Sequence, residues 1–183
     1  MTGFVPSKIF VTKGVGQHKE KLASFELALR QAGIAPFNLV KISSIFPPHC
    51  KLISREEGLK HLKPGQIIFL VMSENATDEP KRVLSASVGL AIPNNPIHYG
   101  YMSEHHSFGQ NKEEVGQYVE DLAAYMLATT LGKKFDLDEI WKEDKSLYQI
   151  SENIIVKTDN ITQNAIGEKN VWTTAFAAAI CLP

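Results

Sequence analysis

The chain has 183 residues, of which 44% are hydrophobic, so it is long enough for one domain with a substantial core. Its 19 basic and 20 acidic residues give a formal net charge of −1 without a block of like charge, which favours a small-molecule or protein partner over nucleic acid. No segment approaches the roughly 18 apolar residues of a membrane span, and the N-terminus lacks a secretory signal pattern, so we expect a cytoplasmic protein.

The first predicted elements lie in the stretch KIFVTKGVGQHKEK, which indicates a short strand, a glycine-bearing loop and a helix. The loop lacks the glycine spacing and the Lys-Ser/Thr end of a P-loop, so nucleotide binding is not expected. The helix is predicted from about Lys21 to Ala32, with Gly33 as its C-terminal stop.

The predicted helix has one apolar stripe that contains a carboxylate. A buried acid needs a partner, so Glu26 is either paired in the interior or placed in water at the edge of the stripe, and periodicity does not decide between the two. The stripe consists of Leu22, Phe25, Glu26, Leu29 and Gly33.

The stretch FNLVKISSI predicts an internal strand, because apolar residues occur on both of its faces. Asn38 shares a face with Val40 and Ile42, which suggests a buried amide that needs hydrogen-bond partners. Pro47 and Pro48 end the strand, since proline cannot donate to a ladder.

The remainder of the chain predicts a single α+β domain, 1–183, with helices on an antiparallel-rich sheet. The long helix in 111–132 has a predicted core stripe of Val115, Val119, Leu122, Met126 and Thr129, with Gly132 as its stop. Further strands are predicted at 65–74, 82–93, 97–106, 153–157 and 172–183, with turns at NATDEPKR and PNNP.

Two serines, Ser43 and Ser44, lie where the predicted strand stops. A serine pair at a strand end is commonly just a turn. The alternative is that the Ser44 hydroxyl attacks the Ser43 carbonyl and converts the peptide bond to an ester that β-elimination breaks. Backbone strain and one oxyanion donor together supply roughly 4–7 kcal/mol, or about 10³ to 10⁵ in rate, so this chemistry requires a strained and rigid setting.

Five stretches follow one another along most of the chain: FELALRQAGIAPFNLVKISSIFPP, SASVGLAIP, GYMSEHH, KEEVGQYVEDLA and FAAAICLP. Together they resemble the pyruvoyl-dependent arginine decarboxylase family, and the block ending in KISSIFPP is the specific one. The resemblance implies a four-layer αββα sandwich, assembled as a homotrimer or dimer of trimers with active sites between neighbouring subunits.

The resemblance also implies that the chain cuts itself between Ser43 and Ser44. The products are a β chain, 1–43, and an α chain, 44–183, whose first residue has become a covalent pyruvoyl group. That group serves as the electron sink when L-arginine is decarboxylated to agmatine and CO₂, a reaction that can supply polyamine biosynthesis. No external cofactor is needed.

By match to the family motifs, Glu104 donates a proton to the decarboxylated carbon. This role requires that the Glu104 side chain be protonated, which a dry cleft would favour. Asn38 assists self-cleavage by holding the developing oxyanion, and Ser43 lies in the substrate pocket as the new carboxyl terminus. Without the resemblance, Glu104 is an exposed acid at a strand end and Asn38 a structural amide.

Glu26 is expected to bind the substrate guanidinium. The family's best-known pattern has an aspartate after the phenylalanine of this helix, and here the residue is glutamate. A glutamate carboxylate can still bind the planar guanidinium group in a bidentate manner, but the extra methylene group moves the carboxylate by about one C–C bond length. Two alternatives therefore stay open: the protein decarboxylates another amino acid, or it is an uncleaved, non-catalytic assembly partner.

Histidines and cysteines give no support to other chemistry. His105 and His106 point to opposite faces of a predicted strand, so no metal site is expected. Cys50 and Cys181 are the only cysteines, and we expect both to be reduced, ordinary thiols.

Overall fold

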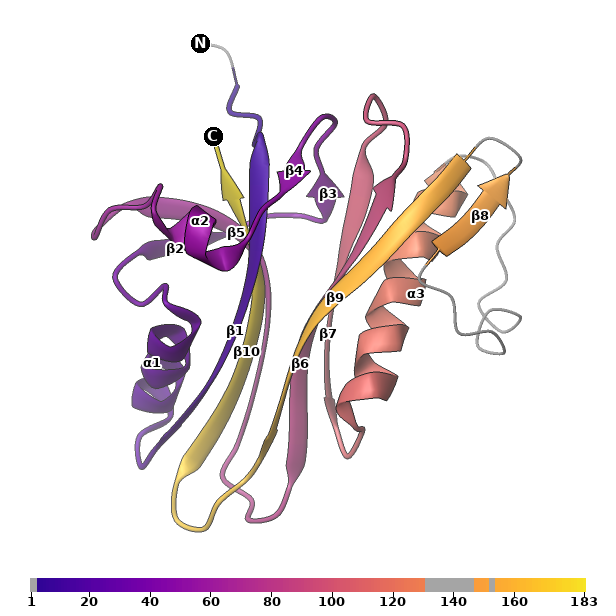
Figure 1. The fold of residues 1–183 in the computed structure, drawn as a ribbon. Coiled ribbons are helices and arrows are strands. Elements are labelled where there is room, and N and C mark those ends of the chain that lie inside the picture. The colour runs from indigo at the N-terminus through magenta and orange to yellow at the C-terminus, as the bar shows by residue number, and fades with distance from the viewer. Residues whose placement is uncertain (1–2, 131–146, 152–153) are drawn as a thin grey trace.

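The computed structural model describes residues 3–130, 147–151 and 154–183, and within these ranges the chain forms two five-stranded sheets and three helices (Figure 1). The first sheet has the order β2-β5-β10-β1-β4 and the second the order β3-β7-β6-β9-β8. Pairs β2–β5 and β1–β4 are parallel, and the other pairs are antiparallel. The elements are β1 Lys8–His18, α1 Lys21–Ala32, β2 Asn38–Lys41, β3 Ile45–Phe46, β4 Lys51–Leu52, α2 Arg55–Leu59, β5 Ile67–Thr77, β6 Val83–Pro93, β7 Gly100–Phe108, α3 Lys112–Thr130, β8 Leu147–Ser151, β9 Ile154–Ile166 and β10 Trp172–Leu182.

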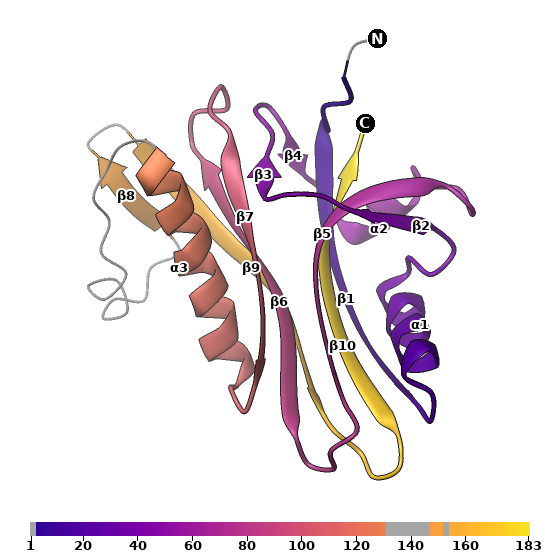
Figure 2. The same ribbon diagram turned by 180° about the vertical axis from the view of Figure 1, so that it is seen from behind.

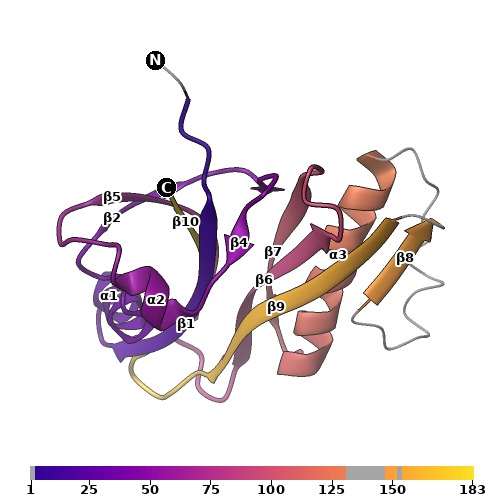
Figure 3. The ribbon, with the colours of Figure 1, turned by 45° about the horizontal axis from the view of Figure 1, so that its top comes forward.

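The two sheets pack face to face, with α1 on the outer side of the first sheet and α3 on the outer side of the second (Figure 1, Figure 3). Aliphatic side chains from both sheets fill the space between them. This mixed content confirms the predicted α+β class. The core between the sheets includes Ile9, Val71, Leu84, Val88, Leu90, Met102, Ala175, Ala177 and Ala179.

The glycines that predict a loop after Phe10 lie instead inside β1, which pairs with β10 along its whole length. A Cβ on Gly14 would lie 2.1 Å from the Ala28 carbonyl oxygen of α1. A Cβ on Gly16 would lie equally close, at 2.1 Å, to the Ser24 carbonyl oxygen. The predicted loop is therefore wrong, because these glycines allow a helix to approach the strand closely.

Helix α1 has the predicted bounds and ends at Gly33, whose φ of 81° lies in the left-handed region that favours glycine. The predicted apolar stripe is confirmed in part: Leu29 is buried and Phe25 packs against the core, but Leu22 is 80% exposed. The helix turns a face of small residues to β1, because the close approach leaves no room for large ones. Its buried residues are Ser24, Ala28, Leu29 and Ala32.

The predicted internal strand FNLVKISSI is divided between the two sheets. Its first part is β2, which forms an edge of the first sheet, and its end is β3, an edge of the second. Val40 is 39% exposed and Asn38 is exposed, so the expected burial of the Asn38 amide is wrong in this chain. Figure 2 shows the chain leaving β2 and crossing to β3 through Ser43 and Ser44.

The other predicted elements differ from the structure mainly in the residues at which they begin and end. Strand β5 continues to Thr77, so the turn begins later than the NATDEPKR signal, and β9 is much longer than the predicted strand at 153–157. In α3, Val115 and Val119 are buried as predicted, whereas the other three predicted stripe residues are half-buried or exposed. Gly132 lies outside the described residues.

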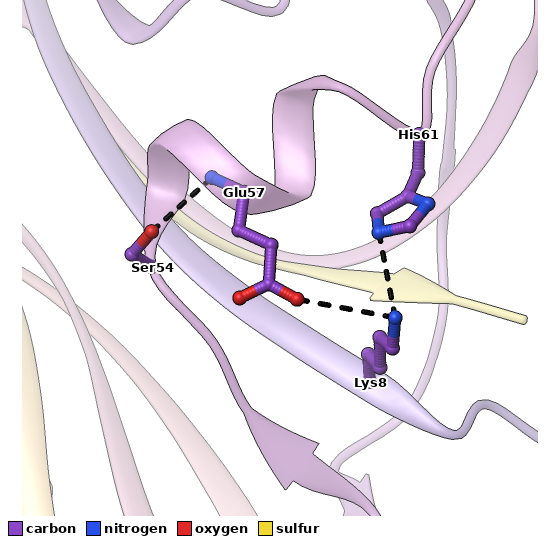
Figure 4. A network of polar contacts seen from close by, with 4 residues as sticks. All are labelled: Lys8, Ser54, Glu57 and His61. Atoms are coloured by element: carbon purple, nitrogen blue, oxygen red, sulfur yellow. Dashed lines mark hydrogen bonds and ion pairs between the residues drawn. The ribbon is translucent and has the colours of Figure 1, made fainter.

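Helix α2 is short and is tied to β1 by polar contacts (Figure 4). The Ser54 hydroxyl oxygen accepts from the Glu57 N–H at 3.1 Å and caps the helix. Lys8 Nζ lies 3.9 Å from Glu57 Oε1 and 3.4 Å from His61 Nε2. Arg55 Nε donates to the Ala32 carbonyl at the end of α1 at 3.1 Å, which satisfies a terminal acceptor.

None of the helices in the described ranges has the length and apolar character needed to cross a membrane.

We predict that Gly14→Ala lowers the free energy of unfolding by about 1–3 kcal/mol, because the new methyl group meets backbone atoms of α1 that cannot rotate away. Urea denaturation followed by circular dichroism measures the change. Gly3→Ala is the matched control, since no atom lies within 4 Å of a Cβ there. Equal stability of the two variants would contradict the close approach of α1 to β1.

Candidate active site

The Ser43–Ser44 peptide bond lies where the chain passes from the edge of the first sheet to the edge of the second (Figure 2). Before the crossing, the Ile42 N–H donates to the Leu70 carbonyl of β5 at 3.0 Å. After it, the Met102 N–H of β7 donates to the Ser44 carbonyl at 2.7 Å. Both sheets therefore hold the chain within a residue or two of this bond.

The main chain turns sharply at Ser44. The Ile45 N–H donates back to the Ser43 carbonyl at 3.2 Å, which closes a three-residue turn of the γ type. Ser43 is exposed and Ser44 half-buried, while Phe46 and Pro47 are buried. The Ser43 carbonyl thus already faces an N–H donor, and the segment that follows is anchored in the core.

A pocket of about 440 Å³ opens beside this crossing. It lies along the part of β5 that β2 does not cover, because the β2–β5 pairing ends at Lys41 and Leu70. The Ser73 hydroxyl of β5 donates to the His105 carbonyl of β7 at 2.6 Å and joins the two sheet edges at the pocket. The lining residues are Lys41, Met72, Ser73, Glu74, Glu104, His105 and His106.

Glu104 is the carboxylate of the pocket that lies two residues after Met102 on β7. Its Oε1 lies 2.8 Å from Lys41 Nζ, and its side chain is 36% exposed. The chain thus brings Glu104 to the end of β2 and, through Met102, to Ser44. The described part of a single chain does not form the dry cleft expected around a proton donor.

Asn38 lies at the opposite end of β2 from Ser44. Three steps along the strand of about 3.3 Å each lead from Asn38 to Lys41, so Asn38 is roughly 10 Å from the pocket end of the strand. Its Nδ2 donates to the Gly65 carbonyl at 3.0 Å. Within one chain, Asn38 therefore makes the contact of a structural amide and does not meet the Ser43 carbonyl.

Glu26 also lies away from the pocket, on α1. Its Oε1 accepts from Arg30 Nε at 2.6 Å, one helical turn later, and its side chain is 44% exposed. It lines a different hollow of about 440 Å³ with Arg30, Gly33, Ala35 and Pro36, and this hollow shares no residue with the pocket beside Ser44. Of the two alternatives left open by periodicity, this chain shows the carboxylate at the edge of the helix, paired with its neighbour.

Lys41 is a pocket residue to which sequence reasoning gives no role. It belongs to the same KISSIFPP block as the two serines, but an exposed lysine near a strand end is common and no local pattern marks it. Its partner Glu104 is far along the chain, so only the folded structure reveals the pair.

The two histidines after Glu104 both line the pocket, and their ring centroids are 6.3 Å apart, so the predicted separation on opposite faces of the strand is not seen. The His105 ring packs on Tyr118 of α3, with ring centroids 4.5 Å apart, and burial lowers the pKa of His105, with a smaller effect from His106 nearby. Across the described residues, no group of three His, Cys, Asp or Glu side chains is arranged to hold a metal ion.

Comparison with known proteins gives consistent matches over nearly the whole chain. The family model described as pyruvoyl-dependent arginine decarboxylase matches residues 8–183. A protein of Chlorobaculum tepidum named probable pyruvoyl-dependent arginine decarboxylase is 58% identical over 180 residues, 98% of this chain and 99% of its own length. A pyruvoyl-dependent arginine decarboxylase of Nitrosopumilus maritimus is 54% identical over 183 residues, 100% of both chains. Pyruvoyl-dependent arginine decarboxylase 2 of Methanosarcina acetivorans is 52% identical over 177 residues, 96% of both.

Cys181 belongs to the core between the sheets, and the partly buried Cys50 packs against that core. Burial raises the pKa of Cys50 to about 11, and burial together with the nearby Cys50 raises the pKa of Cys181 to about 12. Both are therefore protonated thiols near neutral pH, which does not suit a nucleophile.

We predict that Cys50 of the folded protein reacts slowly with iodoacetamide at pH 7.5 and that its rate rises steadily as the pH approaches about 11, because only the thiolate reacts. Mass spectrometry of peptides after timed alkylation follows each cysteine separately. The control is the same protein in urea, where the rate levels off near the ordinary thiol pKa of about 8.5. A plateau near that value in the folded protein would be inconsistent with the burial of Cys50.

Proposed function

This chain belongs to the pyruvoyl-dependent arginine decarboxylase family, and we propose that it cuts itself between Ser43 and Ser44 and then converts L-arginine to agmatine and CO₂. The enzymes of this family are amino-acid decarboxylases, which are carbon–carbon lyases, and their prosthetic group is a covalent pyruvoyl group. The observation that carries the proposal is the position of the Ser43–Ser44 bond, held between two sheet edges beside a pocket that contains Glu104.

In the proposed cut, the Ser44 hydroxyl oxygen bonds to the Ser43 carbonyl carbon and the C–N bond between the residues breaks, which gives an ester. The Ile45 N–H, 3.2 Å from the Ser43 carbonyl oxygen, supports this step because it is placed to stabilise the negative charge that develops there. β-Elimination then releases Ser43 as a carboxylate, and hydrolysis of the unsaturated residue 44 releases ammonia. The products are the β chain, 1–43, and the α chain, 44–183.

The surroundings of Ser44 fit a pyruvoyl group at this position. The amide carbonyl of that group is the Ser44 carbonyl, which the Met102 N–H holds at 2.7 Å on the strand that carries Glu104. When formed, the group supplies the electron sink for the loss of CO₂. In this proposal Glu104 then donates a proton to the carbon that has lost CO₂.

Assembly completes the site in this proposal. The subunit is a four-layer αββα sandwich, and the active sites lie between neighbouring subunits of a homotrimer or a dimer of trimers. Two observations support assembly: Glu26 and Asn38 lie away from the pocket of their own chain, and Leu22 on the Glu26 helix is 80% exposed. A neighbouring subunit then supplies Glu26 to bind the guanidinium and Asn38 to assist the cut.

A second candidate function is a pyruvoyl-dependent decarboxylase of another amino acid. It is retained because Glu26 stands where the best-known family pattern has aspartate. An uncleaved, non-catalytic assembly partner is the remaining alternative. In each case we place the protein in the cytoplasm.

We predict that the purified protein gives two species whose masses divide the chain at residue 44, and that Ser44→Ala remains a single species near 20.3 kDa. The variant lacks the hydroxyl that attacks the Ser43 carbonyl. Denaturing mass spectrometry measures the masses, and borohydride traps the ketone of the larger fragment. Ser54→Ala, a serine change outside the pocket, is the control and should be cleaved. Two chains from Ser44→Ala would refute the proposed cut.

We predict that Glu104→Gln is also cleaved but that its kcat falls by about 10² to 10⁴, because the glutamine side chain cannot donate the proton.

We predict that arginine releases CO₂ faster than lysine, ornithine, histidine or aspartate, and that Glu26→Gln lowers kcat/KM for arginine about 10-fold to 150-fold, because a charged hydrogen bond of about 1.5–3 kcal/mol is lost. The CO₂-release assay with each amino acid measures the ratio. Glu56→Gln, an exposed change on α2, is the matched control and should leave it unchanged. If arginine were no better than lysine, Glu26 would not be the specificity residue.

A further inference from the structure

Lys41 is the last residue of β2 and lies just before the Ser43–Ser44 bond. Its Nζ lies 2.8 Å from Glu104 Oε1 on β7. The ion pair thus joins the segment before the proposed cut to the segment after it, and it does so at the pocket that both residues line.

The charges around the pocket give Lys41 a distinct position. Acidic side chains line it from two strands, Glu74 on β5 and Glu104 on β7, and His105 and His106 also face it. Among the pocket-lining residues that the structure describes, Lys41 alone is a lysine or arginine. Cleavage would add a third anion, the carboxylate of Ser43, close to the same ammonium group.

The pair matters little for the stability of the fold. The Lys41 side chain is 56% exposed and that of Glu104 is 36% exposed, and ion pairs in such settings contribute about 0–1 kcal/mol. Its effect is on geometry, because a flexible glutamate held at 2.8 Å by a neighbouring ammonium adopts one orientation among several. That orientation keeps the carboxyl group at the end of β2, beside Lys41.

We infer that Lys41 is a positioning residue for Glu104: it keeps the Glu104 carboxyl group turned into the pocket and, after cleavage, holds the new end of the β chain beside it. This inference rests on the proposed function, since it assigns Lys41 to the same site. Lys41 acts through Glu104, so its loss should impair the proton-donating step more than the binding of substrate.

The first test does not depend on activity. A carbodiimide joins an amine and a carboxylate that are in contact, forming an amide with loss of water and adding no spacer. We expect a cross-linked peptide between Lys41 and Glu104 in the wild-type protein and in Ser44→Ala, identified by mass spectrometry after digestion. The Lys8–Glu57 pair, 3.9 Å apart, serves as an internal positive control. Absence of the Lys41–Glu104 peptide while the Lys8–Glu57 peptide forms would overturn the inference.

The second test compares kinetic constants. Lys41→Met should be cleaved, lose about 10-fold to 100-fold in kcat for arginine, and keep KM within about threefold, since only part of the general-acid contribution is removed. Lys41→Arg should recover most of kcat, because guanidinium also pairs with carboxylate. Lys63→Met, an exposed lysine away from the pocket, is the matched control and should behave as wild type.

Three outcomes would overturn the inference. Unchanged kcat in Lys41→Met would show that the pair does not position Glu104. A raised KM with unchanged kcat would mean that Lys41 binds the substrate directly. Loss of cleavage in Lys41→Met would assign Lys41 to self-processing. A wild-type protein that neither cleaves nor releases CO₂ would instead refute the proposed function, and the cross-linking result would still decide whether the pair exists.

Discussion

The hydrogen bond from the Met102 N–H to the Ser44 carbonyl fixes the point at which the chain joins the second sheet. The crossing is short, so this contact and the Ile42–Leu70 hydrogen bond on the first sheet together determine where the Ser43–Ser44 peptide bond lies. Glu104 lies two residues after Met102 on the same strand, and alternate residues of a strand share a face, so the strand that holds Ser44 also presents Glu104 to the pocket. The positions of the Ser43–Ser44 bond and of Glu104 therefore both depend on β7.

The pocket results from unequal strand lengths. β2 has 4 residues and β5 has 11, and the pairing covers β5 only as far as Leu70. An uncovered strand edge is ordinarily a site of unwanted pairing between chains. Here the chain leaves that edge at the crossing, and Lys41, Glu74 and Glu104 place charges along the uncovered part. The charged lining makes the uncovered part of this edge suitable for a polar, cationic substrate.

Sequence patterns predict the features that depend on local geometry. Gly33 ends α1 and the prolines after Phe46 end the strand, because backbone restrictions act within a few residues. Gly14 and Gly16 lead to the wrong prediction of a loop, because the sequence does not distinguish a glycine in a turn from a strand glycine that packs under a helix. The strand at 37–45 misleads because apolar residues on both faces do not distinguish an internal strand from an edge. The Lys41–Glu104 pair has no local signal, and the separation of Glu26 from the pocket depends on how α1 lies on the sheet.

β1 lies between β10 and β4 in the first sheet, and both of these neighbours follow residue 44 in the chain. A polypeptide that began at residue 44 would lack β1 and leave a gap between β10 and β4, so folding would have to precede the proposed cut. After the proposed cut, only non-covalent contacts would join the 11 residues of β1 to the 44–183 chain. The proposed cut would therefore change refolding from a unimolecular process to a bimolecular one, and dilution after denaturation would favour separated fragments over recovery.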